Sequence, residues 1–279
     1  MKKISRRSFL AAAGLSVAAL ALTACGGSSA STASSVASSA ASSEAASTSA
    51  AAGELTTVEA GKLTMATNAA FPPYEMTTDA GEFEGIDIET AQAIADKLGL
   101  ELQIDDMDFD AALLSVQQGK ADIVMAGVTV TDERKAVMDF SDRYATGIQS
   151  IIVPEGSDIA SPDDLAGKKI GTQRGTTGYI YCSDDFGDDN VVAYDDGLTA
   201  VQALNNGQVD AVVIDNAPAQ EFIAANPGLK ILDTSYAEED YAIGMAKGSS
   251  LEDAVNAALE ELKADGTLQS IVDKYITAE

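Results

Sequence analysis

An arginine follows an apolar, strand-like stretch in the run VMAGVTVTDERK, residues 124–135. Its guanidinium, Arg134, can bind a carboxylate through two parallel hydrogen bonds, which a lysine cannot do in the same way. Gly127 and Thr129 lie between the strand and this arginine and add a backbone group and a hydroxyl. We therefore expect an anionic group to bind at the end of that strand.

Two more polar groups follow strands elsewhere in the chain. Asp215 directly follows the predicted strand 209–214 and can accept hydrogen bonds from an ammonium group. The run GTQRGTTG, residues 171–178, leads from a strand into a helix start, whose free N–H groups and positive dipole end favour an anion. A guanidinium, hydroxyls, a helix N-terminus and one carboxylate together predict a site for a zwitterion.

The charged residues also have ordinary structural interpretations. Arg134 fits a surface position on a short helix after Asp132 and Glu133, and Asp215 fits the N-cap of a helix over 216–225. In NAAFPPYEM, residues 68–76, the two prolines fix the loop after a strand, and its aromatic residues fit core or rim packing equally well. Spacing alone leaves these alternatives open.

The elements that must position these groups alternate between strand and helix periods. The pattern predicts strands over 62–67, 100–104, 122–126, 169–172 and 209–214, and helices over 87–98 and 109–118. Gly99 and Gly119 are expected to stop the two helices, and Ser161, Pro162 and Asp164 to cap a further helix start. This alternation predicts an α/β fold, in which ligands lie beyond the carboxyl ends of the strands.

An internal repeat favours two lobes of similar build. VQQGKADIVMAG at 116–127 aligns without gaps on LNNGQVDAVVID at 204–215, with Asp122 and Asp210 at the same place. A helix–glycine–strand unit is common enough to recur by chance. Together with the alternation, it leads us to expect lobe I at 54–146 and 239–279, lobe II at 147–238, and a hinge near 144–149 and 236–241.

The first residues predict export and a lipid anchor. In residues 1–24, four basic residues precede an apolar run too short to span a bilayer, which is typical of a signal peptide. The stretch LTAC resembles a lipobox with Cys25 as the lipidated first residue; an ordinary cleavage site is the alternative. SRRSFL, residues 5–10, resembles a twin-arginine signal, although a general secretory signal fits too. The Ala/Ser-rich residues 25–53 predict a flexible tether.

Composition excludes several classes of function. The chain has 44 acidic and 17 basic residues, a net charge of −27, so nucleic acid is a poor partner. It has no histidine, which excludes a histidine base. The acidic clusters at 105–110 and 184–189 lack calcium-loop spacing, and no zinc spacing or phosphate loop occurs. With Cys25 lipidated, Cys182 has no intrachain partner. We expect no metal and no cofactor.

Several segments resemble, in order and spacing, the polar amino-acid-binding family of ABC-transporter solute-binding proteins. They are ATNAAFPPYEM, GEFEGIDIETAQAIADKLG, MDFDAALLSVQQGKADIVMAGVTVTDERKAVMDFSDRY, DLAGKKIGTQRGTTG, NNGQVDAVVIDNAPA and ELKADGTLQSIVDKY. The resemblance implies an α/β, periplasmic-binding-protein-like type II fold, with two lobes of mostly parallel sheets joined by a two-strand hinge. It also implies a monomer that serves the permease subunits of an ABC transporter and is not an enzyme.

The resemblance implies a binding role for ten residues. The ligand's α-carboxylate is assigned to Arg134, Thr129 and the backbone of Thr177, helped by Thr176. Its α-ammonium is assigned to Asp215, Thr129 and the carbonyl of Gly127.

The remaining four residues are assigned to the ligand's side chain. Phe71 and Phe109 would hold that side chain between them, and Asn68 and Gln173 would face it. Asn68 replaces the acidic residue that this family often has there. Because Arg134 and Asp215 already balance the zwitterion, we expect a neutral polar amino acid, with glutamine first.

The resulting hypothesis is an extracellular or periplasmic lipoprotein that captures an amino acid and delivers it to an ABC importer. Two alternatives use the same scaffold. One is an amino-acid sensor domain, which the tether suits equally well. The other is a dehydratase-type enzyme, whose acid–base chemistry would depend on carboxylates.

Overall fold

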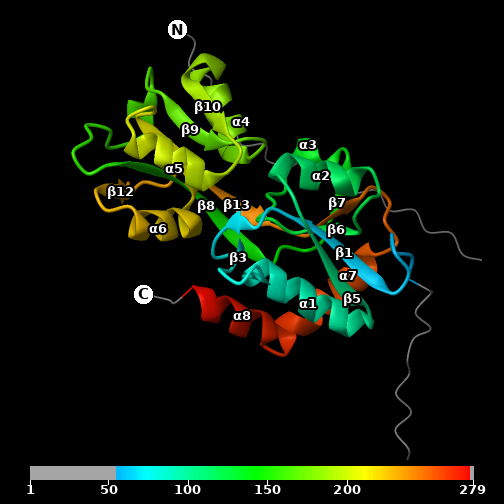
Figure 1. The fold of residues 1–279 in the computed structure, drawn as a ribbon. Helices are drawn as coiled ribbons and strands as arrows, with labels where there is room; N and C mark the ends of the chain where they lie inside the picture. Colours follow the sequence, from blue (N-terminus) through cyan, green and yellow to red (C-terminus); the bar gives the residue numbers. More distant parts are fainter. Residues whose placement is uncertain (1–54, 277–279) are drawn as a thin grey trace, which may run out of the picture. The chain divides into compact units, whose positions relative to one another are not determined.

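The computed structural model describes residues 55–276. The predicted signal peptide, the tether and Cys25 lie outside these residues. Figure 1 shows two β-sheets, each with helices packed against it. No helix in this part of the chain combines the length and apolar character needed to cross a membrane.

The first sheet, in lobe I, has the strand order β5-β1-β6-β14-β7. Its strands are β1 (Lys62–Thr67), β5 (Glu101–Asp106), β6 (Ile123–Val124), β7 (Met138–Phe140) and β14 (Gly244–Ala246). The helices of this lobe are α1 (Ile86–Leu98), α2 (Phe109–Gln117), α3 (Asp132–Lys135), α7 (Glu252–Ala264) and α8 (Thr267–Tyr275). A small separate sheet contains β2 (Ala70–Phe71), β3 (Glu75–Thr77) and β4 (Phe83–Glu84).

The second sheet, in lobe II, has the order β10-β9-β11-β8-β12, and β13 also pairs with β8. Its strands are β8 (Ala145–Pro154), β9 (Ile170–Gln173), β10 (Val191–Tyr194), β11 (Ala211–Asp215), β12 (Leu229–Ile231) and β13 (Ala237–Tyr241). Its α-helices are α4 (Thr177–Phe186), α5 (Gly197–Asn205) and α6 (Asn216–Ala225), and its 3₁₀ turns are η1 (Pro162–Leu165) and η2 (Asp188–Asn190).

The predicted helix signals are confirmed. Gly99 caps α1 in the left-handed conformation, with φ 68°, and Gly119 has φ 67° just after α2. Such a backbone suits glycine, which has no Cβ. Ser161 and Asp164 form the predicted reciprocal capping box, although the turn that they cap, η1, is 3₁₀ rather than α-helical.

The expected α/β fold is confirmed, and its sheets are mixed rather than mostly parallel. Strands separated by helices do pair in parallel: β1 with β5 and β6, and β9 with β10 and β11. Antiparallel pairs form where the chain passes between sheets, as for β8 with β11, β12 and β13, and for β14 with β6 and β7. A strand that arrives without a crossover helix has no reason to run parallel.

The repeated motif has the same structure in both lobes. The Asp122 amide donates to the Thr64 carbonyl at 2.9 Å, and its carboxylate accepts from the Thr64 amide at 2.8 Å. Asp210 makes the same two bonds with Lys169, each at 2.7 Å. Each aspartate therefore fixes the start of a parallel strand pair, β1–β6 or β9–β11, and so aligns the strand ends that carry the polar residues.

Two antiparallel strands link the sheets. β8 and β13 pair from Ala145↔Tyr241 to Ala237↔Gln149 and lie side by side in Figure 1. Just before β8, the Tyr144 amide donates to the Tyr241 carbonyl at 2.9 Å. Both strands lie within or beside the predicted hinge ranges.

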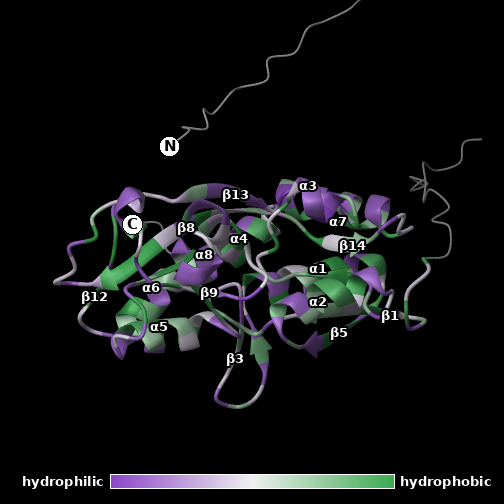
Figure 2. Cartoon of the chain, turned by 90° about the horizontal axis from the view of Figure 1, so that it is seen from above, coloured by the Kyte–Doolittle hydropathy of each residue, from purple (hydrophilic) through white to green (hydrophobic). Residues whose placement is uncertain are grey.

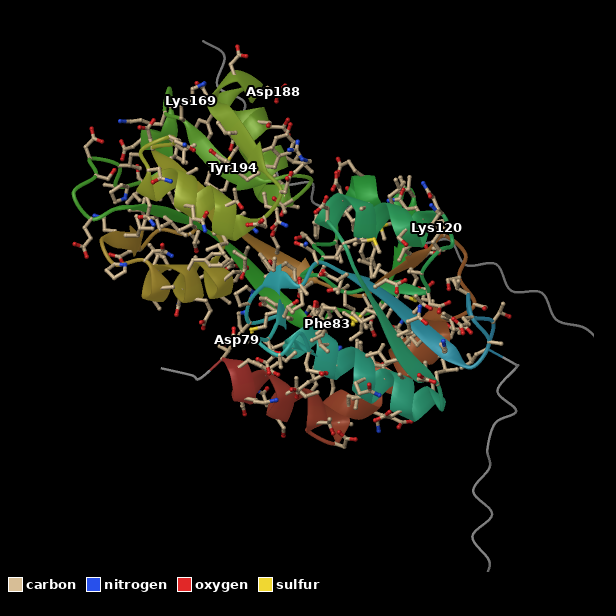
Figure 3. All side chains as sticks on the ribbon, in the orientation of Figure 1. Asp79, Phe83, Lys120, Lys169, Asp188 and Tyr194 are labelled. Atoms are coloured by element: carbon tan, nitrogen blue, oxygen red, sulfur yellow. The ribbon has the colours of Figure 1, made fainter. Side chains whose placement is uncertain are left out.

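Charged side chains cover the outside of the molecule, while the strands supply its apolar interior. Lys120, Lys169 and Asp188 point outward in Figure 3, and all three are exposed. Figure 2 shows the short helix α3 as hydrophilic. Arg134 of this helix is nevertheless only 9 % exposed, which makes it the exception on an otherwise solvated element.

Candidate functional site

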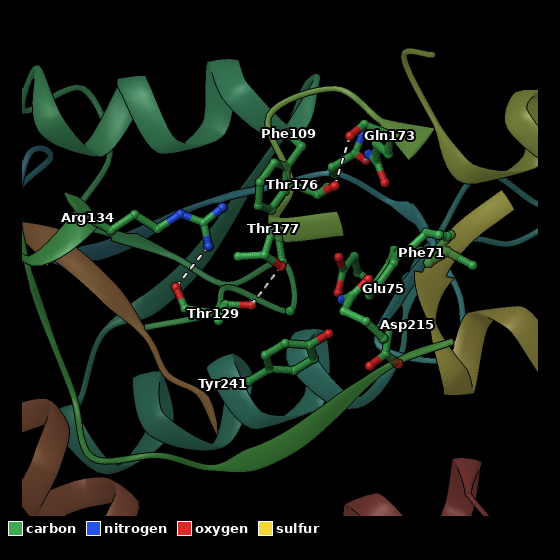
Figure 4. Close-up of a pocket in the computed structure, with 16 residues that line it drawn as sticks. Phe71, Glu75, Phe109, Thr129, Arg134, Gln173, Thr176, Thr177, Asp215 and Tyr241 are labelled. Atoms are coloured by element: carbon green, nitrogen blue, oxygen red, sulfur yellow. Dashed lines mark hydrogen bonds between the residues drawn. The ribbon is translucent and has the colours of Figure 1, made fainter. Parts of the chain in front are cut away.

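A single pocket brings together all ten residues that the sequence singled out. It encloses about 430 Å³ of atom-free space, including its open mouth. Its walls contain Asn68, Phe71, Phe109, Gly127, Thr129, Arg134, Gln173, Thr176, Thr177 and Asp215. Figure 4 shows Arg134 and Asp215 on opposite sides of this pocket. The arrangement is therefore positive at one end and negative at the other.

Arg134 is held in place by backbone groups from both lobes. Its Nη1 donates to the Thr129 carbonyl at 2.8 Å, and its Nη2 donates to the Gly175 carbonyl at 3.2 Å. Its Cζ lies 5.4 Å from the ring centroid of Phe109, within cation–π range. Two of its five donors are thus engaged, and the others remain free to bind a carboxylate. The surface interpretation of Arg134 is wrong.

The loop after β6 needs a glycine at its turn. Gly127 has φ 55°, and a Cβ there would lie 2.9 Å from Cε1 of Phe71. The Gly127 amide donates to Oδ2 of Asp87 at 3.0 Å, and the Tyr144 hydroxyl donates to the same oxygen at 2.8 Å. Asp87, buried behind the pocket, therefore fixes the turn that leads to Thr129.

The N-terminus of α4 faces the pocket from lobe II. The Thr176 hydroxyl is its N-cap, accepting from the Tyr179 amide at 3.3 Å and donating to the Gln173 carbonyl at 2.8 Å. Thr177 follows at the first helical position, with its hydroxyl 3.5 Å from that of Thr129 in lobe I. The Thr176 hydroxyl is already engaged in the cap. The free backbone N–H groups of this turn are therefore the donors that can bind an anion.

Asp215 is both the N-cap of α6 and a residue of the pocket wall. One carboxylate oxygen caps α6 by accepting from the Ala217 amide at 3.0 Å. The other accepts from the Ile148 amide of β8 at 2.7 Å. Asp215 is 2 % exposed, and burial raises its pKa to about 6 while these two bonds oppose the shift. A cation in the pocket would stabilise its ionised form.

An amide–amide contact joins the lobes at another wall. Gln173 Nε2 donates to Asn68 Oδ1 at 2.8 Å, and Asn68 Nδ2 donates to the Met107 carbonyl at 3.0 Å. The two amides thereby orient each other. They offer neutral donors and acceptors rather than charge.

Three polar pocket residues were missed at the sequence level. They are Glu75, Gln149 and Tyr241. Gln149 and Tyr241 lie on the linking strands β8 and β13, and Glu75 opens β3, a strand too short to show periodicity. A usable signal was present for Gln149, a polar residue just before the buried apolar run 151–153.

Glu75 is a third ionisable group of the pocket, besides Arg134 and Asp215. It is fully buried, and neither of its carboxylate oxygens has a hydrogen-bond partner among residues 55–276. Burial, followed by the negative charge of Asp87, holds the pKa of Glu75 well above its usual range. Burial raises the pKa of Asp87 only to about 6, because Gly127 and Tyr144 donate to it. Burial therefore favours the protonated form of the Glu75 carboxyl more strongly than that of Asp87.

Nowhere in residues 55–276 do three His, Cys, Asp or Glu side chains gather closely enough to hold an ion. Cys182 is buried, and burial raises the pKa of its thiol to about 12, which keeps it protonated and unreactive.

Comparison with known proteins gives consistent matches. Residues 63–278 match the bacterial extracellular solute-binding proteins, family 3. The chain is 33 % identical to the L-cystine-binding protein TcyJ of Escherichia coli K12, over 79 % of this chain and 85 % of that protein. It is also 33 % identical to the arginine-binding extracellular protein ArtP of Bacillus subtilis, over 78 % and 87 % of the two chains. An ancestral arginine-binding protein bound to glutamine superposes with a TM-score of 0.75 at 42 % identity, covering 78 % of this chain and 99 % of that one.

Proposed function

The chain belongs to the bacterial extracellular solute-binding proteins of family 3, and on that premise we propose that it captures a free, neutral polar amino acid and delivers it to an ABC importer. Its relatives are amino-acid-binding components of ABC transporters, not enzymes, which sets the dehydratase alternative aside. We rank L-glutamine first among the ligands.

The observation that carries this proposal is the opposed pair formed by Arg134 and Asp215. Both side chains are at least nine-tenths buried on the walls of one pocket. A buried charge left unpaired costs several kcal/mol, so each side chain favours a ligand group of opposite sign. An α-amino acid carries both groups on its α-carbon, a carboxylate for Arg134 and an ammonium for Asp215. The hydroxyl of Thr129 completes this end of the site.

The rest of the pocket favours a neutral side chain. Asn68 and Gln173 present amides, and burial favours the protonated form of the Glu75 carboxyl by holding its pKa well above its usual range. A carboxamide both donates and accepts hydrogen bonds, as do these three groups. Glutamine can therefore bind without adding an unmatched charge.

A cationic ligand such as arginine is the second candidate. Glu75 supports it, because a buried carboxyl without partners can ionise when a cation enters. The match to an arginine-binding relative favours the same class. Its binding would release a proton from Glu75, whereas glutamine binding would not.

A thermal-shift panel of the twenty amino acids tests the proposal. The protein from residue 54 onward should show its largest rise in melting temperature with L-glutamine. If no amino acid raises it, the proposal fails. Calorimetry in two buffers of different ionisation enthalpy then separates the candidates. If ligand binding releases a proton and the affinity rises with pH above neutral, the preferred ligand is a cationic amino acid rather than glutamine.

We further propose that β8 and β13 act as the hinge of lobe closure between lobe I (54–146 and 239–279) and lobe II (147–238). Closure would bring the Thr177 end of α4 onto a ligand held by Arg134, and would exclude water from the charges. The closed form is then what the permease recognises. Small-angle scattering should report a smaller radius of gyration on ligand addition, and an unchanged radius would argue against this motion.

Lipid anchoring through Cys25 completes the proposal. A mature cysteine with an acyl anchor would hold the body at a membrane surface while the tether leaves it free to move. Globomycin, which blocks lipoprotein signal cleavage, should cause unprocessed precursor to accumulate. Normal processing would exclude the anchor and favour an ordinary cleavage site.

A further inference from the structure

Glu239 is a buried acidic residue that the binding proposal leaves unexplained. It lies on β13, is 6 % exposed, and makes no ion pair with any described residue. Its Oε2 accepts two hydrogen bonds, from the Thr129 hydroxyl at 3.0 Å and from Gln149 Nε2 at 3.0 Å. Its Oε1 has no partner among residues 55–276. Both donors line the pocket.

The direction of the Thr129 hydrogen bond follows from the chemistry of the two groups. The Thr129 hydroxyl donates to the carboxylate oxygen Oε2 of Glu239, so its single proton points at Glu239. The oxygen of Thr129 then offers only lone pairs to its other neighbours. The contact of 3.5 Å with Thr177 must therefore have Thr177 as donor.

This direction decides which end of an amino acid Thr129 can bind. A hydroxyl oxygen with only lone pairs left can accept from an ammonium group. It cannot donate to a carboxylate, and it would repel one. The carboxylate is then left to Arg134, whose remaining donors are free, and to the open backbone N–H groups at the start of α4.

We propose that Glu239 is a positioning residue that fixes the Thr129 hydroxyl as an acceptor, and so dedicates this hydroxyl to the ligand's ammonium group. The inference rests on the proposed binding of a free amino acid. It departs from the sequence-based expectation that Thr129 serves both ends of the ligand. Glu239 also orients the Gln149 amide, so one carboxylate on a linking strand sets two pocket groups.

A mutant series separates this role from a merely structural one. Glu239→Met removes both acceptor oxygens in a side chain of similar length, whereas Glu239→Gln keeps an acceptor oxygen and removes only the charge. Affinity for L-glutamine, or for L-arginine if the parent protein prefers it, is measured by calorimetry, and folding by thermal melting. Because a hydrogen bond to a charged group is lost, Glu239→Met should weaken binding by about tenfold or more. Glu239→Gln should stay within about threefold of the parent.

Two controls decide the assignment. In a Thr129→Val background, Glu239→Met should cause little further loss, because the hydroxyl through which it acts is absent. The des-amino analogues, glutaramic acid or 5-guanidinopentanoic acid, should lose less than about threefold affinity in Glu239→Met, since they have no ammonium.

Three outcomes would overturn the inference while leaving amino-acid binding intact. The losses of affinity could be additive in the double variant, or equal for the amino acid and its des-amino analogue. The third is a Glu239→Gln variant that binds as weakly as Glu239→Met. If the parent protein binds neither amino acid, the proposed function fails and this inference fails with it.

Discussion

Replacing Arg134 by lysine tests whether the pocket needs a planar guanidinium or only a positive charge. The guanidinium spans the lobes by donating to the Thr129 and Gly175 carbonyls, and its free donors are proposed to hold the ligand carboxylate. A lysine ammonium places its three donors at one point and cannot reach all of these acceptors. At least one hydrogen bond to a charged group is lost, which costs about 1.5–3 kcal/mol, or roughly a 10- to 150-fold rise in Kd.

Isothermal calorimetry with L-glutamine measures this change, and thermal melting reports whether the variant is folded. Arg143→Lys is the matched control, because the Arg143 side chain is 67 % exposed and forms an ion pair with the exposed residue Asp240, at 2.9 Å. That control should bind as the parent does. A folded Arg134→Lys variant within about threefold of the parent Kd would refute the bidentate role of Arg134.

Three other predictions concern Asp215, the linking strand and the η1 cap. Asp215 must be ionised to hold an ammonium, so the affinity for the ligand should fall by about tenfold per pH unit below about pH 6. Asp215→Asn should bind weakly and should lack this pH dependence. Gly147→Ala should lower the melting temperature and weaken binding, because its Cβ would overlap the ring of Tyr241, whereas Gly156→Ala, with open space around it, should do neither. Ser161→Ala should cost about 1 kcal/mol of stability, roughly 2–4 °C in melting temperature, with Kd unchanged. A parent affinity that does not change with pH would contradict the role of Asp215. A Gly147→Ala variant with unchanged melting temperature and affinity would contradict the predicted clash with Tyr241. A changed Kd in Ser161→Ala would contradict a purely structural role of the cap.

The dual role of Asp215 sharpens the mutational test of the site. Its carboxylate satisfies two buried amides, those of Ile148 and Ala217, besides facing the pocket. Asp215→Ala would leave both amides without their partner, so a loss of binding would be mixed with a loss of stability. Asparagine keeps one acceptor oxygen and is therefore the cleaner substitution.

Local signals in the sequence predicted much of the fold. Gly99 and Gly119 stop helices because the left-handed backbone suits glycine, and Ser161 with Asp164 caps a turn through bonds between residues three apart. The repeat around Asp122 and Asp210 predicted two similar lobes, since each lobe contains a helix–strand unit of the same length.

What the sequence by itself determined is the set of groups available at the strand ends: a guanidinium, hydroxyls, amides and a carboxylate. Only the tertiary structure decided how these groups are used. Glu239 and Thr129 are 110 positions apart in the sequence, and Asp87 and Gly127 are 40 apart. The hydrophobic periods of strands and helices, two and 3.6 residues, describe only local structure and therefore cannot predict either contact. Burial is likewise a property of the folded molecule. It raises the pKa of Glu75 in the pocket wall well above its usual range, because desolvation disfavours the charged form of the carboxyl group.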